Sequence, residues 1–202
     1  MQHFTHDQLP ALAHLLTAGG VVLMPTDTIY GLHAVATNAR AVARIAQLKG
    51  RDDAKPFVVL GASVAQLQTL GISASDDVLR RLGELWPAPL TVILPLAAPL
   101  PASRGASTLA VRIPADEWLR ELLLRTGPLV STSANRSGEP PVEEPKNLAR
   151  DLLNALDGLL DAGPRAGEAS AIVDLTSDEP RFIRESHPSF TQKVWKTLRK
   201  TL

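Results

Sequence analysis

The chain of 202 residues contains no cysteine, few aromatic residues and no excess of charge of either sign. Without cysteine it has no disulfide, thiolate nucleophile or cysteine-bound metal, and this composition fits a reducing compartment, which we expect to be the cytoplasm. Lys and Arg number 21, as do Asp and Glu, so the chain lacks the positive field that drives non-specific binding to nucleic acids. Its 45% hydrophobic content is enough for a substantial core.

Common catalytic motifs are also absent. The chain has no Walker A motif, no G-x-G-x-x-G and no G-x-S-x-G elbow, which argues against ordinary kinases, dehydrogenases and hydrolases. Its five histidines show no metal-ligand spacing beyond His3-x-x-His6, so we expect no structural zinc. The N-terminus lacks the features of a signal peptide, and prolines interrupt the apolar run from 86 to 100, so we expect a soluble protein.

Apolar periodicity and turn signals predict strands alternating with helices along most of the chain. The predicted strands cover 21–24, 57–60, 91–94, 109–113, 129–130, 171–175 and 181–184. The predicted helices cover 7–18, about 41–48, 63–70, 75–85, 116–125, 145–156 and a terminal stretch capped by Ser189, with further candidate caps at Asn38, Ser63 and Ser75. Residues 131–141 are mostly small, polar or turn-forming and are expected to run over the surface. This order predicts a single α/β domain with a mixed sheet.

Hydroxyl and basic side chains gather in the first part of the chain. Thr26 and Thr28 follow the strand 21–24, in a segment that we interpret as a turn, and the next helix leads to Lys49 and Arg51 at or just beyond its C-terminus. Two cations near a hydroxyl-rich turn are typical of a site for an anionic substrate. The ordinary alternative is that Thr and Asp form turns and that basic residues favour helix C-termini through the macrodipole.

Further polar residues stand where later strands end. Arg112 and Arg184 end two strands, and residues 131–135 follow a third. Because open α/β sheets bind ligands at strand ends, these residues and Lys55 predict a site that binds phosphates and a carboxylate without a P-loop. Alternatively, such arginines only extend along the surface. His33 could titrate near neutrality, although a packing or hydrogen-bonding histidine is the commoner case.

At these residues the chain resembles the YrdC family, specifically its short bacterial threonylcarbamoyl-AMP synthases. The resemblance runs from about Gly19 to Glu185 through the motifs PTDTIYGL (25–32), KGR (49–51), WPAPLT (86–91), VRIP (111–114), STSANRSG (131–138) and SAIVD (170–174). It implies one domain over residues 1–202, a twisted mixed sheet flanked by helices around a concave pocket, and no additional C-terminal domain. The chain departs from the usual family residues at His33, Ala88, Ala171 and Ser186.

The resemblance also implies an activity, the synthesis of threonylcarbamoyl-AMP and pyrophosphate from L-threonine, bicarbonate and ATP, usually with magnesium. The product serves the threonylcarbamoylation of the adenosine beside the anticodon in certain tRNAs. By motif position, the threonine-binding residues would be Thr28, Arg112, Ser131 and Ser170. The ATP-binding residues would be Arg51, Lys55, Thr108, Ser133, Asn135, Pro141 and Arg184. Lys49 and Arg51 would be catalytic, with Lys49 holding bicarbonate or phosphate oxygens.

The implied partners are the small-molecule substrates and downstream tRNA threonylcarbamoyl-transfer proteins, with at most weak tRNA binding and no membrane. Two other functions stay open. An RNA-binding module would use the concave surface and the basic C-terminal helix, but a neutral chain with 3 Trp, 1 Tyr and 4 Phe offers few platforms for stacking bases. A paralogue of the same fold would act on a related carbamoyl nucleotide, although the intact motifs argue against divergence.

Overall fold

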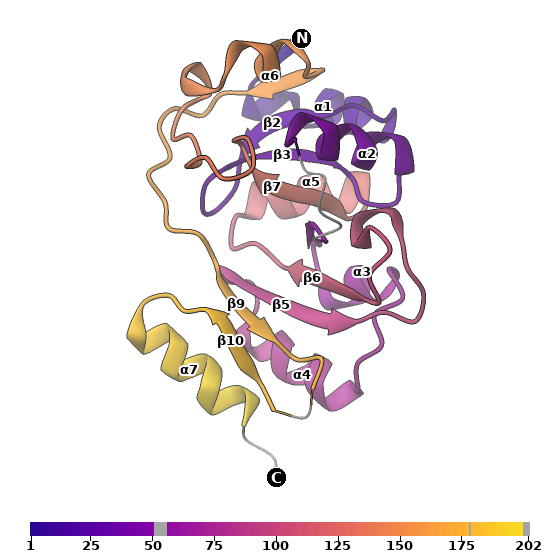
Figure 1. The fold of residues 1–202 in the computed structure, drawn as a ribbon, viewed down its shortest axis with the longest axis vertical. Coiled ribbons are helices and arrows are strands. Elements are labelled where there is room, and N and C mark those ends of the chain that lie inside the picture. Colours follow the sequence, from indigo (N-terminus) through magenta and orange to yellow (C-terminus); the bar gives the residue numbers. More distant parts are fainter. Residues whose placement is uncertain (51–55, 178, 200–202) are drawn as a thin grey trace.

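One mixed sheet organises the part of the chain that the computed structural model describes, residues 1–50, 56–177 and 179–199. Parallel and antiparallel pairs alternate irregularly across its ten strands. In spatial order they are β1 Gln2–Phe4, β8 Gly158–Leu160, β2 Val22–Pro25, β3 Tyr30–Val35, β7 Leu129–Ser133, β4 Val58–Leu60, β6 Thr108–Arg112, β5 Leu90–Pro95, β9 Ala171–Asp174 and β10 Arg181–Arg184. Figure 1 shows this sheet twisting through the molecule with helices around it. The predicted fold class is confirmed.

The helices begin largely where the sequence predicts. They are α1 Leu9–Thr17, α2 Ala39–Leu48, α3 Val64–Gln68, α4 Asp76–Leu85, α5 Glu117–Thr126, α6 Arg150–Asn154 and α7 Pro188–Leu198, with short 3₁₀ turns η1 His6–Gln8, η2 Pro101–Ser103 and η3 Pro145–Asn147. The side chains of Asn38, Ser63 and Ser75 each accept a backbone N–H in the first turn of α2, α3 and α4, which confirms the three predicted caps. No helix in the described ranges has the length and hydrophobicity that a membrane crossing needs.

The two faces of the sheet pack against different helices. α1 and α5 lie together on one face, whereas α2 and α4 contribute to a larger hydrophobic cluster on the other. Alternation along the strands accounts for the division. In β2, Val22 and Met24 join the cluster of α1 and α5, and Leu23, which points the other way, joins the second cluster. The C-terminal helix α7 packs against α4 (Figure 1).

Residues 25–32 do not form a single turn as predicted. β2 continues through Pro25, β3 begins at Tyr30, and only residues 26–29 reverse the chain between these antiparallel strands. The expected strand–turn–helix unit is therefore wrong, because a second strand precedes α2. Gly31 and His33 interrupt the apolar pattern of β3, and this hides the strand from an analysis based on hydrophobic alternation.

The surface course predicted for residues 131–141 is wrong for its first half. β7 extends through Ser133 and is paired with β3 on one side and β4 on the other. Ser131, Ala134 and Asn135 are buried. Serine and threonine are common in loops, and this hides the strand from sequence analysis although the backbone groups of residues 131–133 are paired within the sheet. From position 137 to 141 the chain is exposed, as expected.

Smaller differences occur near both ends of the chain. β1 and β8 form an unpredicted parallel pair at one edge of the sheet. The single helix expected over 145–156 is replaced by η3 and α6, because Leu148 adopts an extended backbone and Ala149 a non-helical one between them. Helix α7 begins at Pro188 with His187 as its N-cap, since proline suits a first helical position, so Ser189 lies inside the helix and is not its cap.

Candidate active site

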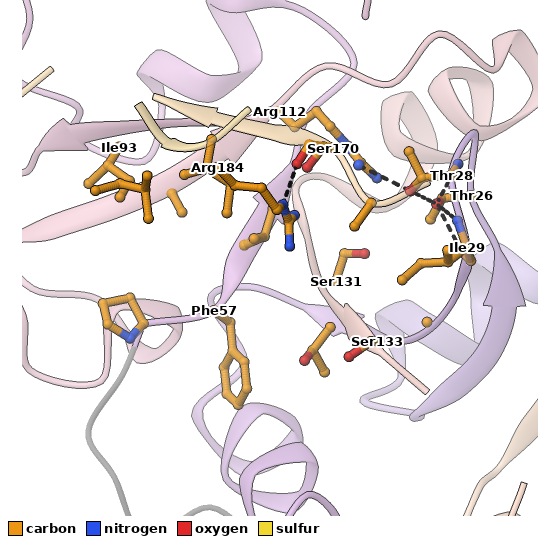
Figure 2. A pocket seen from close by; sticks show the side chains of 18 of the residues that line it. Thr26, Thr28, Ile29, Phe57, Ile93, Arg112, Ser131, Ser133, Ser170 and Arg184 are labelled. Atoms are coloured by element: carbon orange, nitrogen blue, oxygen red, sulfur yellow. Dashed lines mark hydrogen bonds between the residues drawn. The ribbon is translucent and has the colours of Figure 1, made fainter. Parts of the chain in front are cut away.

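A cavity of about 360 Å³ opens where α1 and α5 leave their face of the sheet uncovered. Val58 and Ser131 line it, and they point to the same face as Leu60 and Leu129, which pack beneath those helices two residues along their strands. Small residues line its floor, and Gly31 among them has no side chain that could fill the space. Figure 2 shows Thr26, Thr28 and Ile29 at one end, Ile93 at the other, and Ser131 and Ser133 between them. The predicted concave pocket is therefore present.

The turn between β2 and β3 is held by its own hydroxyls. Thr26 Oγ1 accepts hydrogen bonds from the backbone N–H groups of Thr28 at 3.2 Å and Ile29 at 3.3 Å. It also lies 3.0 Å from the carbonyl oxygen of Ile29 and 2.9 Å from Thr28 Oγ1. Both threonines are buried. These contacts fix the Thr28 hydroxyl at the wall of the cavity.

Arg112 occupies the enclosed end of the cavity and is only 4% exposed. Its Nη1 donates to Thr28 Oγ1 at 3.2 Å, its Nη2 lies 3.3 Å from Asp27 Oδ1, and Asp27 Oδ2 accepts the N–H of Ala115 at 3.0 Å. Burial lowers the pKa of Arg112, the charge of Asp27 raises it, and the charge of Arg184 lowers it, but a guanidinium stays charged in proteins. Among the described residues its Nε has no hydrogen-bond partner. The site therefore holds a buried, oriented cation.

Ser170 and Arg184 form the adjoining wall. Ser170 Oγ lies 2.8 Å from Thr91 Oγ1, and Arg184 Nε donates to the carbonyl oxygen of Ser170 at 2.7 Å. Ser170 and Thr91 are buried, whereas Arg184 is exposed at the open end (Figure 2). Burial lowers the pKa of Arg184. The wall thus places a fixed hydroxyl near Arg112 and a second cation nearer to solvent.

Lys49 is a buried cation behind β7. As predicted, it follows the last residue of α2, but its ammonium group does not extend into solvent. Nζ donates to the carbonyl oxygen of Ser133 at 2.7 Å and to Asn135 Oδ1 at 2.8 Å, and lies 3.3 Å from Ser133 Oγ. Asn135 in turn donates from Nδ2 to the carbonyl oxygen of Glu139. Lys49 therefore fixes the end of β7 and the loop that follows it.

The structure brings together six of the residues predicted for the site. The cavity is lined by Thr28, Arg112, Ser131, Ser133, Ser170 and Arg184. Lys49 and Asn135 support this wall from behind. Thr108 lies on the same face of β6 as Arg112 but outside the cavity lining, and Pro141 is exposed in the loop after β7. Arg51 and Lys55 lie outside the described residues.

Two supporting residues escaped the sequence analysis. Asp27 was noted only as part of a turn, and Thr91 only as part of a strand, yet they hold Arg112 and Ser170 in place. A hydroxyl inside an otherwise apolar strand is the signal that could have identified Thr91. The isoleucines at the open end, Ile93, Ile172 and Ile183, were likewise missed, because apolar residues in predicted strands resemble core residues.

His33 does not titrate near neutrality, which corrects the first of the two interpretations given for it. It is fully buried in β3, with Nε2 3.3 Å from the carbonyl oxygen of Met24. Burial lowers its pKa to about 4. His33 is therefore the packing and hydrogen-bonding histidine of the alternative. Across the described ranges, no group of three or more His, Asp or Glu side chains is placed to hold a metal ion.

Two relatives of this chain carry the same activity name. Proteins named threonylcarbamoyl-AMP synthase from Pyrococcus abyssi and Bacillus subtilis are 35% and 34% identical to it, over 85% and 88% of the chain. The alignments cover 52% and 53% of those proteins, so the chain spans about half the length of these relatives.

A solved structure agrees with these sequence matches. The crystal structure of P. abyssi Sua5 complexed with L-threonine has a TM-score of 0.81 and 31% identity, covering 91% of this chain and 56% of that one. The family model Sua5_yciO_yrdC, described as "Telomere recombination", matches residues 14–186. Because this match includes both walls of the cavity and most of the chain, the chain belongs to the Sua5/YciO/YrdC family.

Proposed function

We propose that this chain is a threonylcarbamoyl-AMP synthase, forming threonylcarbamoyl-AMP and pyrophosphate from L-threonine, bicarbonate and ATP. The observation that carries the proposal is the buried Arg112 at the enclosed end of the cavity, beside the hydroxyls of Thr28 and Ser170. A desolvated guanidinium with oriented hydroxyls suits a small zwitterion that presents a carboxylate. The names of the relatives and the L-threonine in the P. abyssi Sua5 structure support the same substrate.

The enclosed end would hold threonine. Arg112 would pair with its carboxylate through donors that Thr28 and Asp27 leave available. Ser131 and Ser170 would orient the amino and hydroxyl groups. Because these side chains are already fixed by neighbouring residues, little ordering would be needed on binding.

The open end would hold ATP. Arg184 stands there beside the apolar Ile93 and Ile183, a combination that suits phosphates near a cation and a base against aliphatic side chains. Ser133 lies between the two ends of the cavity. We retain Arg51, Lys55, Thr108, Asn135 and Pro141 as proposed contributors to the ATP side.

The chemistry would require no protein nucleophile. The amine of threonine would first attack the carbon of bicarbonate, forming the carbamate N–C bond as a C–O bond breaks and water is released. A carbamate oxygen would then attack the α-phosphate of ATP, breaking the bond to the leaving pyrophosphate. The chain would hold the two reactants in line and stabilise the negative charge that develops on the phosphate. We assign Arg51 to this charge and Lys49 to the orientation of Ser133 and of the oxygens near it.

Magnesium would enter with ATP as the counter-ion of its phosphates, where it would neutralise charge on the leaving group. The product is a mixed anhydride and is labile, so it would pass to a protein that transfers the threonylcarbamoyl group to tRNA. We place this exchange in the cytoplasm.

Mass spectrometry of the reaction products tests the proposal. The purified chain is incubated with ATP, L-threonine and isotopically labelled bicarbonate, and the labelled carbon is expected in threonylcarbamoyl-AMP, with pyrophosphate released in equal amount. Serine serves as the competing amino acid, and reactions that omit one substrate serve as controls. Pyrophosphate release that is independent of threonine, or the absence of a labelled adenylate, contradicts the proposal.

A further inference from the structure

Residues 161–170, here called the strap, connect β8 to β9 across the edge of the candidate site. Figure 1 shows this orange chain running along one side of the molecule, from the region of α6 down to β9. The strap ends at the cavity, where Ala169 and Ser170 are lining residues. It therefore joins the part of the sheet that carries Thr28 to the part that carries Arg184.

Hydrogen bonds anchor the strap along its length. At its start, Tyr30 Oη accepts the N–H of Ala162 at 2.9 Å and donates to the carbonyl oxygen of Gly163 at 2.8 Å. Farther along, the N–H of Arg165 donates to the carbonyl oxygen of Glu143 at 2.8 Å. Tyr30 is the first residue of β3, so the strap is fastened directly behind the Thr28 turn.

Gly167 brings the strap into contact with that turn. A Cβ at this position would lie 1.8 Å from the carbonyl oxygen of Thr28 and 2.8 Å from its carbonyl carbon. The atoms in the way belong to the backbone, so no side-chain rotation relieves the overlap. The φ angle of Gly167 lies outside the left-handed region, which means that glycine is required here for space and not for conformation.

The contact between Gly167 and Thr28 matters because the Thr28 hydroxyl makes two contacts within the site. This hydroxyl receives the hydrogen bond from Arg112 and lies 2.9 Å from Thr26 Oγ1. Displacement of the Thr28 backbone would move this hydroxyl and loosen the orientation of Arg112. A displacement of about 1 Å in a substrate-positioning residue can cost on the order of a hundredfold in rate.

We propose that Gly167 is a positioning residue that holds the Thr28 turn against the cavity and thereby sets the affinity for the amino acid substrate. This inference rests on the proposed function. Gly167 allows the backbone of the strap to approach the backbone of Thr28 closely. Any side chain at this position, whatever its size, would therefore displace the Thr28 turn. ATP, which we place at the opposite end, would be affected much less.

Gly167→Ala and Gly167→Ser test this together. Isothermal titration is expected to show threonine binding weakened by at least about tenfold in both variants, to a similar extent, because the Cβ itself makes the contact. The KM for ATP is expected to change less than about twofold. Gly83→Ala is the matched control: Gly83 has no atom within 4 Å of a Cβ and no positive φ, and threonine binding should stay unchanged.

Different results separate the two proposals. If the unaltered chain does not bind threonine, the proposed function fails. If the unaltered chain binds it and folded Gly167→Ala binds it equally well, or if threonine and ATP are weakened alike, the role of Gly167 is refuted. Should neither Gly167 variant fold, Tyr30→Phe loosens the strap without adding bulk. It is expected to weaken threonine binding by about threefold with ATP unaffected, and unchanged threonine binding in Tyr30→Phe overturns the inference.

Discussion

The two ends of the cavity differ in how far they are enclosed. At the enclosed end Arg112 is 4% exposed and contacts both Asp27 and Thr28, and Ser170 is fixed by Thr91. At the open end Ile183 is 52% exposed. An enclosed, oriented end suits a small ligand that must be recognised atom by atom, and an open end admits a larger one. The difference predicts that variants at the two ends separate the two substrates.

The largest expected effect comes from exchanging the two arginines in turn for alanine. Arg112→Ala is expected to raise the threonine Kd by about tenfold to a hundredfold, because a charge-assisted hydrogen bond contributes about 1.5 to 3 kcal/mol. Arg184→Ala is expected to act mainly on ATP, raising its KM by about threefold to tenfold, because this guanidinium is less buried. Titration with each substrate and steady-state kinetics measure the two effects.

The control for both arginines is Arg80→Ala. Arg80 is exposed on α4, where it forms ion pairs with Asp77 and Glu84 away from the cavity. This variant should leave both affinities unchanged. If Arg112→Ala and Arg184→Ala each weaken the binding of threonine and of ATP to the same extent, the two ends do not have separate roles. Both substrates would then share one mixed site.

A smaller effect is expected at the Thr28 hydroxyl. Thr28→Val keeps the shape of the side chain but removes the acceptor for Arg112 and the contact with Thr26. The variant leaves the charge of Arg112 in place and removes only the hydroxyl that orients it, so a net loss of about 0.5 to 1.5 kcal/mol is expected and the threonine Kd should rise by about twofold to tenfold. Thr28→Ser keeps the hydroxyl and should bind threonine normally. Normal binding by Thr28→Val together with a loss in Thr28→Ser would assign the effect to the methyl group and not to the hydroxyl.

The same contrast explains what could be predicted from the sequence. Thr28, Arg112 and Arg184 were predicted because strand ends and turns are local features, and the local pattern places their side chains near an edge of the sheet. Asp27 and Thr91 were not predicted in their supporting roles, because each acts on a residue far away in the chain. Long-range pairing leaves no periodic trace in a single sequence.

Strand β7 shows the other limit of sequence reasoning. Ser131 to Ser133 have the composition of a loop, but β3 and β4 on either side satisfy their backbone groups, and burial follows from this pairing. The role of the strap could not be predicted from the sequence for a related reason. A segment without regular structure has no pattern, and the need for Gly167 arises only from the carbonyl group of Thr28.

The smallest expected effect lies beneath the enclosed end, at His33. Burial keeps this imidazole neutral and lowers its pKa from 6.5 to about 4, and the nearby charge of Arg112 acts in the same direction. As the pH falls through about 6.5, His33 binds a proton in the unfolded chain but stays neutral in the folded chain. The folded state is therefore most stable above this pH and loses stability progressively toward about pH 4.

Between about pH 7 and about pH 5.5 this linkage lowers the free energy of unfolding by about 1 kcal/mol. Urea denaturation at several pH values measures the loss, and His33→Asn should flatten the profile because the group that titrates is gone. His14→Asn, at an exposed position of α1, is the control and should leave the profile unchanged. A His33→Asn profile as steep as that of the unaltered chain would mean that other groups cause the acid sensitivity. A flattened His33→Asn profile would show that His33 is neutral in the folded chain at these pH values. Arg112 then supplies the positive charge at the enclosed end without a contribution from His33.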